Sequence, residues 1–219
     1  MNVAEAVVTR RSIRAFTEQT VDLETMRRVL EAARMAPSGC NYQPWEATVL
    51  TGAPLKALQD VLLASKPDDP LEYDFSAPGQ VDKYKQRLST LGAQMYGAMA
   101  IGRQDVDQRE LFSRQNLTSF GAPVLLLSHF PKLMKEPQWS DVGMWLQTIM
   151  LLLRDEGLDS CPQEWMGIYG RTIKTHLGLS DDTMLFCGIA IGYRDPDAAV
   201  NNFERERVPL DEQVRFLGF

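Results

Sequence analysis

The sequence changes from a helical to a strand pattern within the segment Ala36-Pro37-Ser38-Gly39-Cys40-Asn41-Tyr42-Gln43-Pro44-Trp45. Pro37 ends the preceding helix, because proline lacks an N–H and disfavours helical geometry in the residue before it. Gly39 permits a backbone bend and the close approach of a flat ligand. Ser38, Asn41 and Gln43 offer uncharged hydrogen-bonding groups. From these residues alone, an ordinary connecting loop and a ligand-binding loop both remain open.

Size and composition indicate a globular protein with one substantial core. The chain has 219 residues, of which 44% are hydrophobic and 24% are charged. The net charge of −6 argues against a general binder of nucleic acid or anionic membranes. The apolar stretch 144–153 is interrupted by Gln147 and Thr148 and is too short to span a bilayer. We therefore expect a single domain over residues 1–219, with no nucleic-acid or membrane partner.

Cysteine and histidine usage excludes the common metal sites. The three cysteines show no CxxC spacing, and there are only two histidines, so we expect no metal site. Sparse cysteines suit a reducing compartment, and the N-terminus lacks a signal-peptide pattern, so we expect a cytoplasmic location. His129 follows a buried apolar run and is expected to be structural.

Helical and extended patterns are mixed along the chain, and helix dominates. Asn2, with Glu5 three residues later, is expected to cap a first helix, and Asp22 a second. Further helices are predicted from Pro54 and at 81–100, 103–116, 142–154 and 171–177, and strands at 46–51, 124–129 and 183–193. Residues 158–165 are predicted to be a connecting segment. The fold class is α+β, with a central mixed β-sheet wrapped by helices.

Arginines gather near both ends of the chain. Arg10, Arg11 and Arg14 surround Ser12, which suits a phosphate or a polyol chain, although a solvated basic turn has the same composition. Arg205 and Arg207 alternate with Glu204 and Glu206, so exposed ion pairs are an equally open interpretation there.

Residues 65–80 form a long segment without a regular period. It carries Tyr73 and Phe75, which we predict to help cover a substrate pocket, whereas a surface insertion without function is the alternative. The chain has no G-x-S-x-G, H-E-x-x-H, Walker or G-x-G-x-x-G sequence. An enzyme so poor in catalytic motifs makes sense if a cofactor performs the chemistry.

Three motifs together resemble the nitroreductase family of FMN enzymes. They are Arg10-Arg11-Ser12-Ile13-Arg14, the Pro37 to Trp45 loop, and Gly192-Tyr193-Arg194-Asp195-Pro196 followed by Arg205-Glu206-Arg207-Val208-Pro209. The resemblance implies a nitroreductase-like fold, and within the family it is to the branch that resembles nitrobenzoate and nitroaromatic reductases. It also implies a homodimer with FMN at the subunit interface and a tail, residues 195–219, that wraps the partner.

The resemblance also assigns roles to individual residues. The flavin phosphate and ribityl chain would be bound by Arg10, Arg14, Arg205 and Arg207, with Arg11 and Ser12 nearby. The flavin ring would meet Pro37, Ser38, Gly39 and Asn41 of the second subunit. A backbone N–H near flavin N5 would come from the segment containing Gln163, Glu164 and Trp165. No catalytic side chain is assigned, because the flavin carries the chemistry.

The implied activity is electron transfer from NADH or NADPH through FMN to nitroaromatics, quinones or similar flat acceptors. One site serving both partners in turn gives ping-pong kinetics. Two alternatives remain open at this stage: another flavin reaction on the same fold, such as reductive dehalogenation or ene reduction, and a flavin-binding sensor or store without turnover. No nucleotide-ribose motif distinguishes NADH from NADPH.

Overall fold

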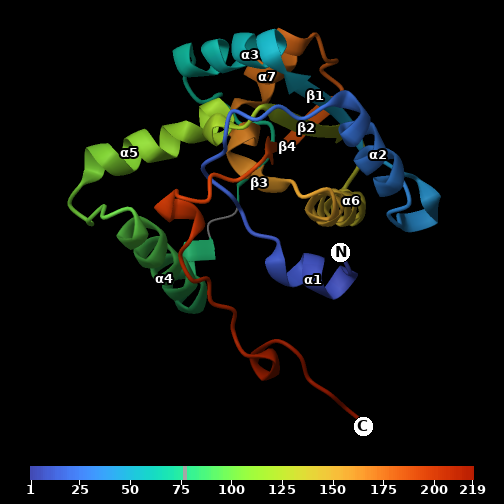
Figure 1. Ribbon diagram of the computed structural model, residues 1–219. Helices are drawn as coiled ribbons and strands as arrows, with labels where there is room; N and C mark the ends of the chain where they lie inside the picture. The colour runs from blue at the N-terminus through green and yellow to red at the C-terminus, as the bar shows by residue number, and fades with distance from the viewer. Residues whose placement is uncertain (76–77) are drawn as a thin grey trace.

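A four-stranded sheet lies at the centre of the protein (Figure 1), in a computed structural model that describes residues 1–75 and 78–219. The strands are β1 (Glu46–Thr51), β2 (Val124–Pro131), β3 (Asp159–Gln163) and β4 (Thr183–Gly192), in the order β1-β2-β4-β3. Predicted strands 46–51, 124–129 and 183–193 are confirmed. Each neighbouring pair is antiparallel.

The expected mixed sheet is therefore an antiparallel one. Helix α6 (Glu136–Asp155) connects β2 to β3, an arrangement that usually gives adjacent parallel strands. Here β4 lies between them and runs against both. Within the described ranges, parallel pairing is limited to one isolated bridge between Ser12 and Ser160. The connecting segment expected at 158–165 contains β3, and its Pro162 is tolerated because β3 is an edge strand.

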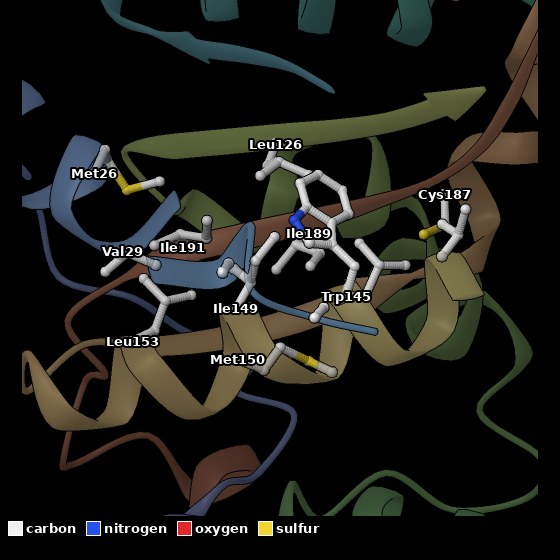
Figure 2. Packing of buried hydrophobic residues seen from close by; sticks show 14 of the residues in the cluster. Met26, Val29, Leu126, Trp145, Ile149, Met150, Leu153, Cys187, Ile189 and Ile191 are labelled. Carbon is white, nitrogen blue, oxygen red and sulfur yellow. The ribbon is translucent and has the colours of Figure 1, made fainter. Parts of the chain in front are cut away.

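Alternate residues of β2 pack on opposite faces of the sheet, as the two-residue period of a strand requires. Leu126 faces α6 and α2 (Leu23–Ala33), and Figure 2 shows it with Val29 of α2 and Trp145 and Ile149 of α6. Leu125 and Leu127 instead join the second core cluster, which includes residues of α3 (Gly52–Ala64) and α7 (Gly170–Leu177). The sheet is thus covered by helices on both faces, which explains the unbroken apolar run in β2.

The remaining helices lie around this core. They are α1 (Val3–Thr9), α4 (Asp82–Ala98) and α5 (Val106–Arg114). The predicted caps are present: Asn2 Oδ1 accepts the Glu5 N–H at 2.9 Å, and Asp22 Oδ1 accepts the Thr25 N–H at 2.7 Å. Helix α4 has no buried residue among those described. No helix in the described part of the chain is long and apolar enough to cross a membrane.

His129 is buried where β1 pairs with β2. Its Nε2 lies 3.1 Å from Thr48 Oγ1, and its Nδ1 lies 3.3 Å from a Glu46 carboxylate oxygen. Burial lowers the pKa of His129, and the charge of Glu46 offsets that shift only in part. These contacts match a structural role.

The protein is expected to lose stability as the pH falls below about 6.5, the ordinary histidine pKa, because the unfolded chain then takes up a proton that folded His129 does not bind. His129→Gln should remove this contribution, whose slope is at most about 1.4 kcal/mol per pH unit. Urea unfolding between about pH 5 and pH 8 measures it. His176→Gln, at the exposed second histidine, is the control and should retain the wild-type slope.

Candidate functional site

The N-terminal arginine segment lies between the edge of the sheet and the C-terminal tail. The Ile13 N–H donates to Ser160 O of β3 at 3.0 Å. The backbone N–H of the next residue, Arg14, donates to Asn201 Oδ1 in the C-terminal tail at 2.9 Å. The two ends of the chain therefore meet beside β3.

The arginines of the two ends come together at this meeting point. Arg205 donates to Val8 O at 2.9 Å, and Arg11 donates to Phe203 O. Burial and then the charge of Arg207 lower the pKa of Arg10. The pKa of Arg205 is lowered by burial and then by the charges of its neighbours, Arg10 first. Mutual repulsion of this kind requires that the guanidinium groups are close.

This cluster carries positive charge that the described residues do not neutralise with ion pairs. No carboxylate among the described residues forms an ion pair with Arg10, Arg11, Arg14, Arg205 or Arg207. The ion pairs considered for Arg205 and Arg207 are thus absent there; Arg207 donates to the backbone oxygen of Glu206 at 2.8 Å. Uncompensated guanidinium groups held together are a binding site for an anion such as phosphate.

Cys161 lies beneath the arginines on β3. Burial raises its pKa to about 11, even though the charges of Arg14 and Arg10 act in the opposite direction. The side chain is therefore a neutral thiol near neutral pH and not a nucleophile.

A cavity of about 870 Å³ adjoins the cluster. Arg14 lines it together with residues of α4 and with Arg103 and Arg109, which follow α4 in the chain. This size lies within the range of small-molecule sites.

The segment expected to supply a backbone N–H follows β3. Gln163 is buried, and its Nε2 donates to Asn116 O at 2.9 Å. Glu164 and Trp165 are exposed and begin a 3-10 helix, Glu164–Tyr169.

The segment around Tyr73 is attached to the body of the protein rather than lying free on its surface. Asp68 accepts the Arg171 N–H at 2.7 Å, and Glu72 is buried in ion pairs with Lys174 and Lys132. The part of the expected 65–80 insertion at residues 76–77 lies outside the described residues.

Tyr73 itself lies against the helix that begins at Glu164. Its hydroxyl donates to Phe186 O at 2.6 Å and sits over Gly167, and its ring stacks on Phe75 with 4.6 Å between centroids. Burial, followed by the charges of Cys187 and Glu164, raises the pKa of Tyr73. Tyr73 is thus held in place close to the segment of Gln163, Glu164 and Trp165, and Phe75 stacks on its ring.

The loop at residues 37–45 is mostly exposed up to Gln43, its Pro44 is buried, and it is held on the N-terminal half of α6. Its Gly39 N–H donates to Asp141 Oδ2 at 3.2 Å, and Trp45 stacks on Trp145 with 5.8 Å between ring centroids. Cys40, Asn41 and Gln43 have positive φ angles of 51°, 58° and 49°. Such strained geometry often marks functional loops.

No hydrogen bond or ion pair between described residues joins this loop to the arginine cluster. Within the described part of one chain, the polar contacts of Ser38 and Gly39 are therefore made to their own loop and to α6, and not to the arginines.

Comparison with known proteins decides the family. The family model described as "Nitroreductase family" matches residues 7–193. The chain belongs to the nitroreductase family. The resemblance expected from three short motifs is thereby confirmed.

Relatives of this nitroreductase-family chain are similar over nearly its whole length. It is 36% identical over 217 residues to the 4-nitrobenzoate reductase of Pseudomonas putida, covering 97% of this chain and 94% of that protein. It is 33% identical over 209 residues to nitroreductase NfnB of Mycolicibacterium smegmatis, covering 94% and 89%.

Solved structures confirm the nitroreductase-like fold. The crystal structure of the FMN and NADPH-dependent nitroreductase NfnB from Sphigopyxis sp. strain HMH matches with a TM-score of 0.95 and 44% identity, covering 100% of both chains. The FMN-dependent NfnB from Mycobacterium smegmatis, in complex with NADPH, matches with a TM-score of 0.90 and 32% identity, covering 99% of this chain and 100% of that chain.

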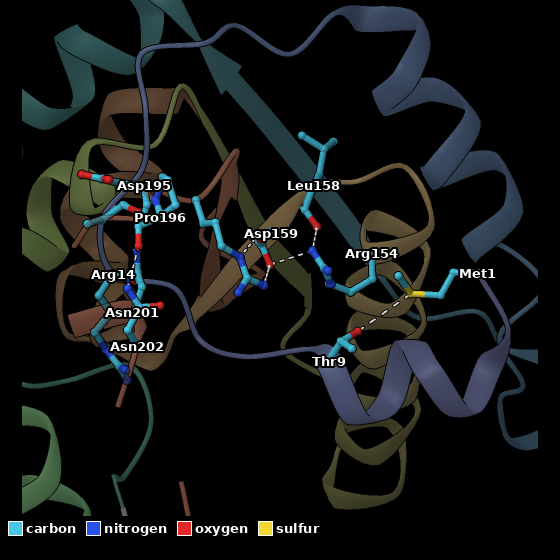
Figure 3. A network of polar contacts seen from close by, with 12 residues as sticks. Met1, Thr9, Arg14, Arg154, Leu158, Asp159, Asp195, Pro196, Asn201 and Asn202 are labelled. Atoms are coloured by element: carbon cyan, nitrogen blue, oxygen red, sulfur yellow. Dashed lines mark hydrogen bonds and ion pairs between the residues drawn. The ribbon is translucent and has the colours of Figure 1, made fainter. Parts of the chain in front are cut away.

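Two polar residues that support the site were not singled out from the sequence (Figure 3). Buried Asn201 accepts the Arg14 N–H and donates to Ala15 O and Asp195 O, both at 2.9 Å. Asp159 of β3 accepts hydrogen bonds from Arg154 at 2.9 Å and from Arg194 at 2.6 and 2.7 Å. Arg194 lies in the Gly192 to Pro196 motif, and its presence there is the one feature of the sequence that could have indicated a buried acidic partner such as Asp159.

No group of three or more His, Cys, Asp or Glu side chains in the described part of the chain could hold a metal ion.

Proposed function

We propose that this protein is an FMN-dependent oxidoreductase that takes electrons from NADPH or NADH and passes them to nitroaromatic compounds, quinones or similar flat acceptors. The observation that carries this proposal is the uncompensated arginine cluster, built from both ends of a nitroreductase-family chain. The similarity to solved nitroreductases described as FMN and NADPH-dependent supports it.

The residues of the cluster fit the phosphate of FMN. Arg10, Arg14, Arg205 and Arg207 would bind the phosphate and ribityl chain, with Ser12 beside them, because forked N–H donors match phosphate oxygens. Arg11 donates to Phe203 O, so we assign it to holding the tail in place. Bound FMN would accept a hydride and pass electrons on; the protein would bind and orient it, and Gln163, Glu164 and Trp165 would border its ring.

We further propose a homodimer in which the second subunit completes each site with Pro37, Ser38, Gly39 and Asn41. Exposed apolar side chains in residues 195–219 support a tail that packs on a partner: Phe216 is 58% exposed and Leu217 is 70% exposed. In Figure 1 the last part of this tail, which ends at the label C, extends away from the body of the chain. Light scattering after gel filtration tests this arrangement, and a monomer that retains FMN would contradict it.

Residues 1–219 would act as a single FMN-binding domain around the one sheet. All three cysteines are free, which suits a reducing compartment, and we propose a cytoplasmic location.

Anaerobic stopped-flow spectroscopy tests the proposed activity. The purified yellow protein should bleach when NADPH or NADH is added and should regain its colour when a nitroaromatic or a quinone is added. Steady-state rates should give the parallel double-reciprocal lines of ping-pong kinetics. A protein that bleaches without reoxidation by any acceptor would be a flavin binder only, and one that cannot take up FMN would contradict the proposal entirely.

Substitution of Phe75 by alanine is expected to change acceptor preference without loss of flavin. Phe75 is half-buried against Tyr73, and Tyr73 is anchored to Phe186 O. Removing an aromatic wall from a pocket changes discrimination between acceptors by roughly 10- to 100-fold in kcat/KM. The measurement compares a small and a bulky nitroaromatic, with Tyr84→Ala on α4 as an exposed aromatic control. Unchanged preference in the Tyr73→Ala/Phe75→Ala double variant would show that this segment does not cover the pocket.

A further inference from the structure

The cavity beside α4 combines an apolar lining with three arginines. Leu88, Leu91 and Ile101 supply apolar lining, and Arg14, Arg103 and Arg109 supply charge. No acidic side chain lines it among the described residues. The lining is suited to a flat ring that carries a negative charge.

Arg109 is placed to recognise such a charge. Its guanidinium lies over the Tyr96 ring, 4.3 Å from the ring centroid, so the aromatic face holds the planar group in place. The N–H groups of a guanidinium lie in its plane, and stacking leaves them free to bind a carboxylate in bidentate fashion.

Nearby carboxylates do not neutralise these arginines. Among the described residues, none forms an ion pair with Arg14, Arg103 or Arg109. Asp105 accepts the Gly102 N–H at 2.7 Å, and Glu206 accepts from Gln94 of α4 at 3.0 Å.

We infer that this cavity binds electron acceptors that carry a carboxylate, with Arg109 as the residue that selects for the anion. The inference rests on the proposed function, because Arg14 belongs both to the proposed flavin site and to the lining of the cavity. An acceptor there would adjoin the flavin while its carboxylate meets Arg109. The acceptor class is then nitroaromatic acids rather than neutral nitroaromatics.

The test compares 4-nitrobenzoate with neutral 4-nitrobenzamide in steady-state assays of the holoenzyme. Wild type should favour the acid in kcat/KM. Arg109→Gln should lower kcat/KM for the acid by about tenfold or more, through KM, because a charge-assisted bidentate pair is lost. The amide should change less than about twofold, and Arg109→Lys should recover part of the preference. Arg27→Gln, at an exposed position on α2, is the matched control.

Three outcomes would overturn the inference. The first is equal use of acid and amide by wild type. The second is loss of FMN from Arg109→Gln, seen as reduced flavin absorbance after desalting, which would assign the cavity to the cofactor. The third is a rise in KM for NADPH but not for NADH, which would assign Arg109 to the nucleotide phosphate. None of these three outcomes would contradict the proposed function itself, because bleaching by NADPH or NADH and reduction of neutral acceptors test that function separately.

Discussion

Replacing Arg10 and Arg205 together by glutamine should yield a protein that is purified without FMN. The two guanidinium groups come from opposite ends of the chain. Burial lowers the pKa of both; the charge of Arg207 adds to the shift of Arg10, and the charge of Arg10 adds to the shift of Arg205, a repulsion that bound phosphate would relieve. A hydrogen bond to a charged group contributes about 1.5–3 kcal/mol, so the loss of two corresponds to a rise in Kd of roughly 100-fold or more. This is the largest effect on function that the site predicts.

Flavin absorbance after desalting, followed by titration with FMN, measures the loss. Arg28→Gln is a suitable control, because Arg28 pairs with Glu156 on the exposed surface and should leave FMN binding unchanged. The stability of the protein without FMN provides an independent test of the repulsion between the arginines. Removal of two charges from a repulsive cluster should not destabilise the apoprotein, and the wild-type apoprotein should melt at a higher temperature in phosphate buffer. Wild-type FMN affinity in the double variant would place the phosphate elsewhere.

Asp159→Asn should produce the largest loss of stability. The Asp159 side chain is 3% exposed and accepts from both Arg154 and Arg194. An amide in its place turns an N–H₂ group toward two guanidinium donors and leaves their charges partly buried without a counter-charge. Removing one partner from a buried ion pair costs about 3–5 kcal/mol.

Urea unfolding measures this cost as a lower midpoint at an unchanged slope. Asp60→Asn removes an exposed carboxylate paired with Lys56 one helical turn away, and it should cost less than about 1 kcal/mol. A loss for Asp159→Asn as small as that for Asp60→Asn would mean that the two arginines find other partners.

The helices and the long strands could be predicted because each depends on local sequence. The Asn2 and Asp22 caps and the apolar run of β2 are read from neighbouring residues, and all are confirmed. Strand β3 was missed because five residues containing Pro162 have no clear period, and they are extended only through pairing with β4. The order of strands was also beyond the sequence, because the position of β4 between β2 and β3 depends on contacts distant in the chain.

In the candidate site, too, some features could be predicted from local sequence and others depend on contacts between distant segments. The motif at residues 10–14 and the pair Arg205 and Arg207 were recognisable, but whether the second pair formed ion pairs could be decided only from the folded tail. Asn201 and Asp159 act through hydrogen bonds that no spacing rule reveals. The roles of Ser38 and Asn41 toward a flavin remain predictions, because they depend on the proposed second subunit.

The meeting of the two chain ends has a consequence for biosynthesis. Arg10 emerges first from the ribosome, whereas Arg205 and Arg207 emerge only when nearly all 219 residues have been made. The arginine cluster therefore cannot form until Arg205 and Arg207 have been synthesised. Any fragment truncated before Arg205 should be purified without flavin, so flavin absorbance of the purified protein would report a polypeptide that extends at least through Arg207.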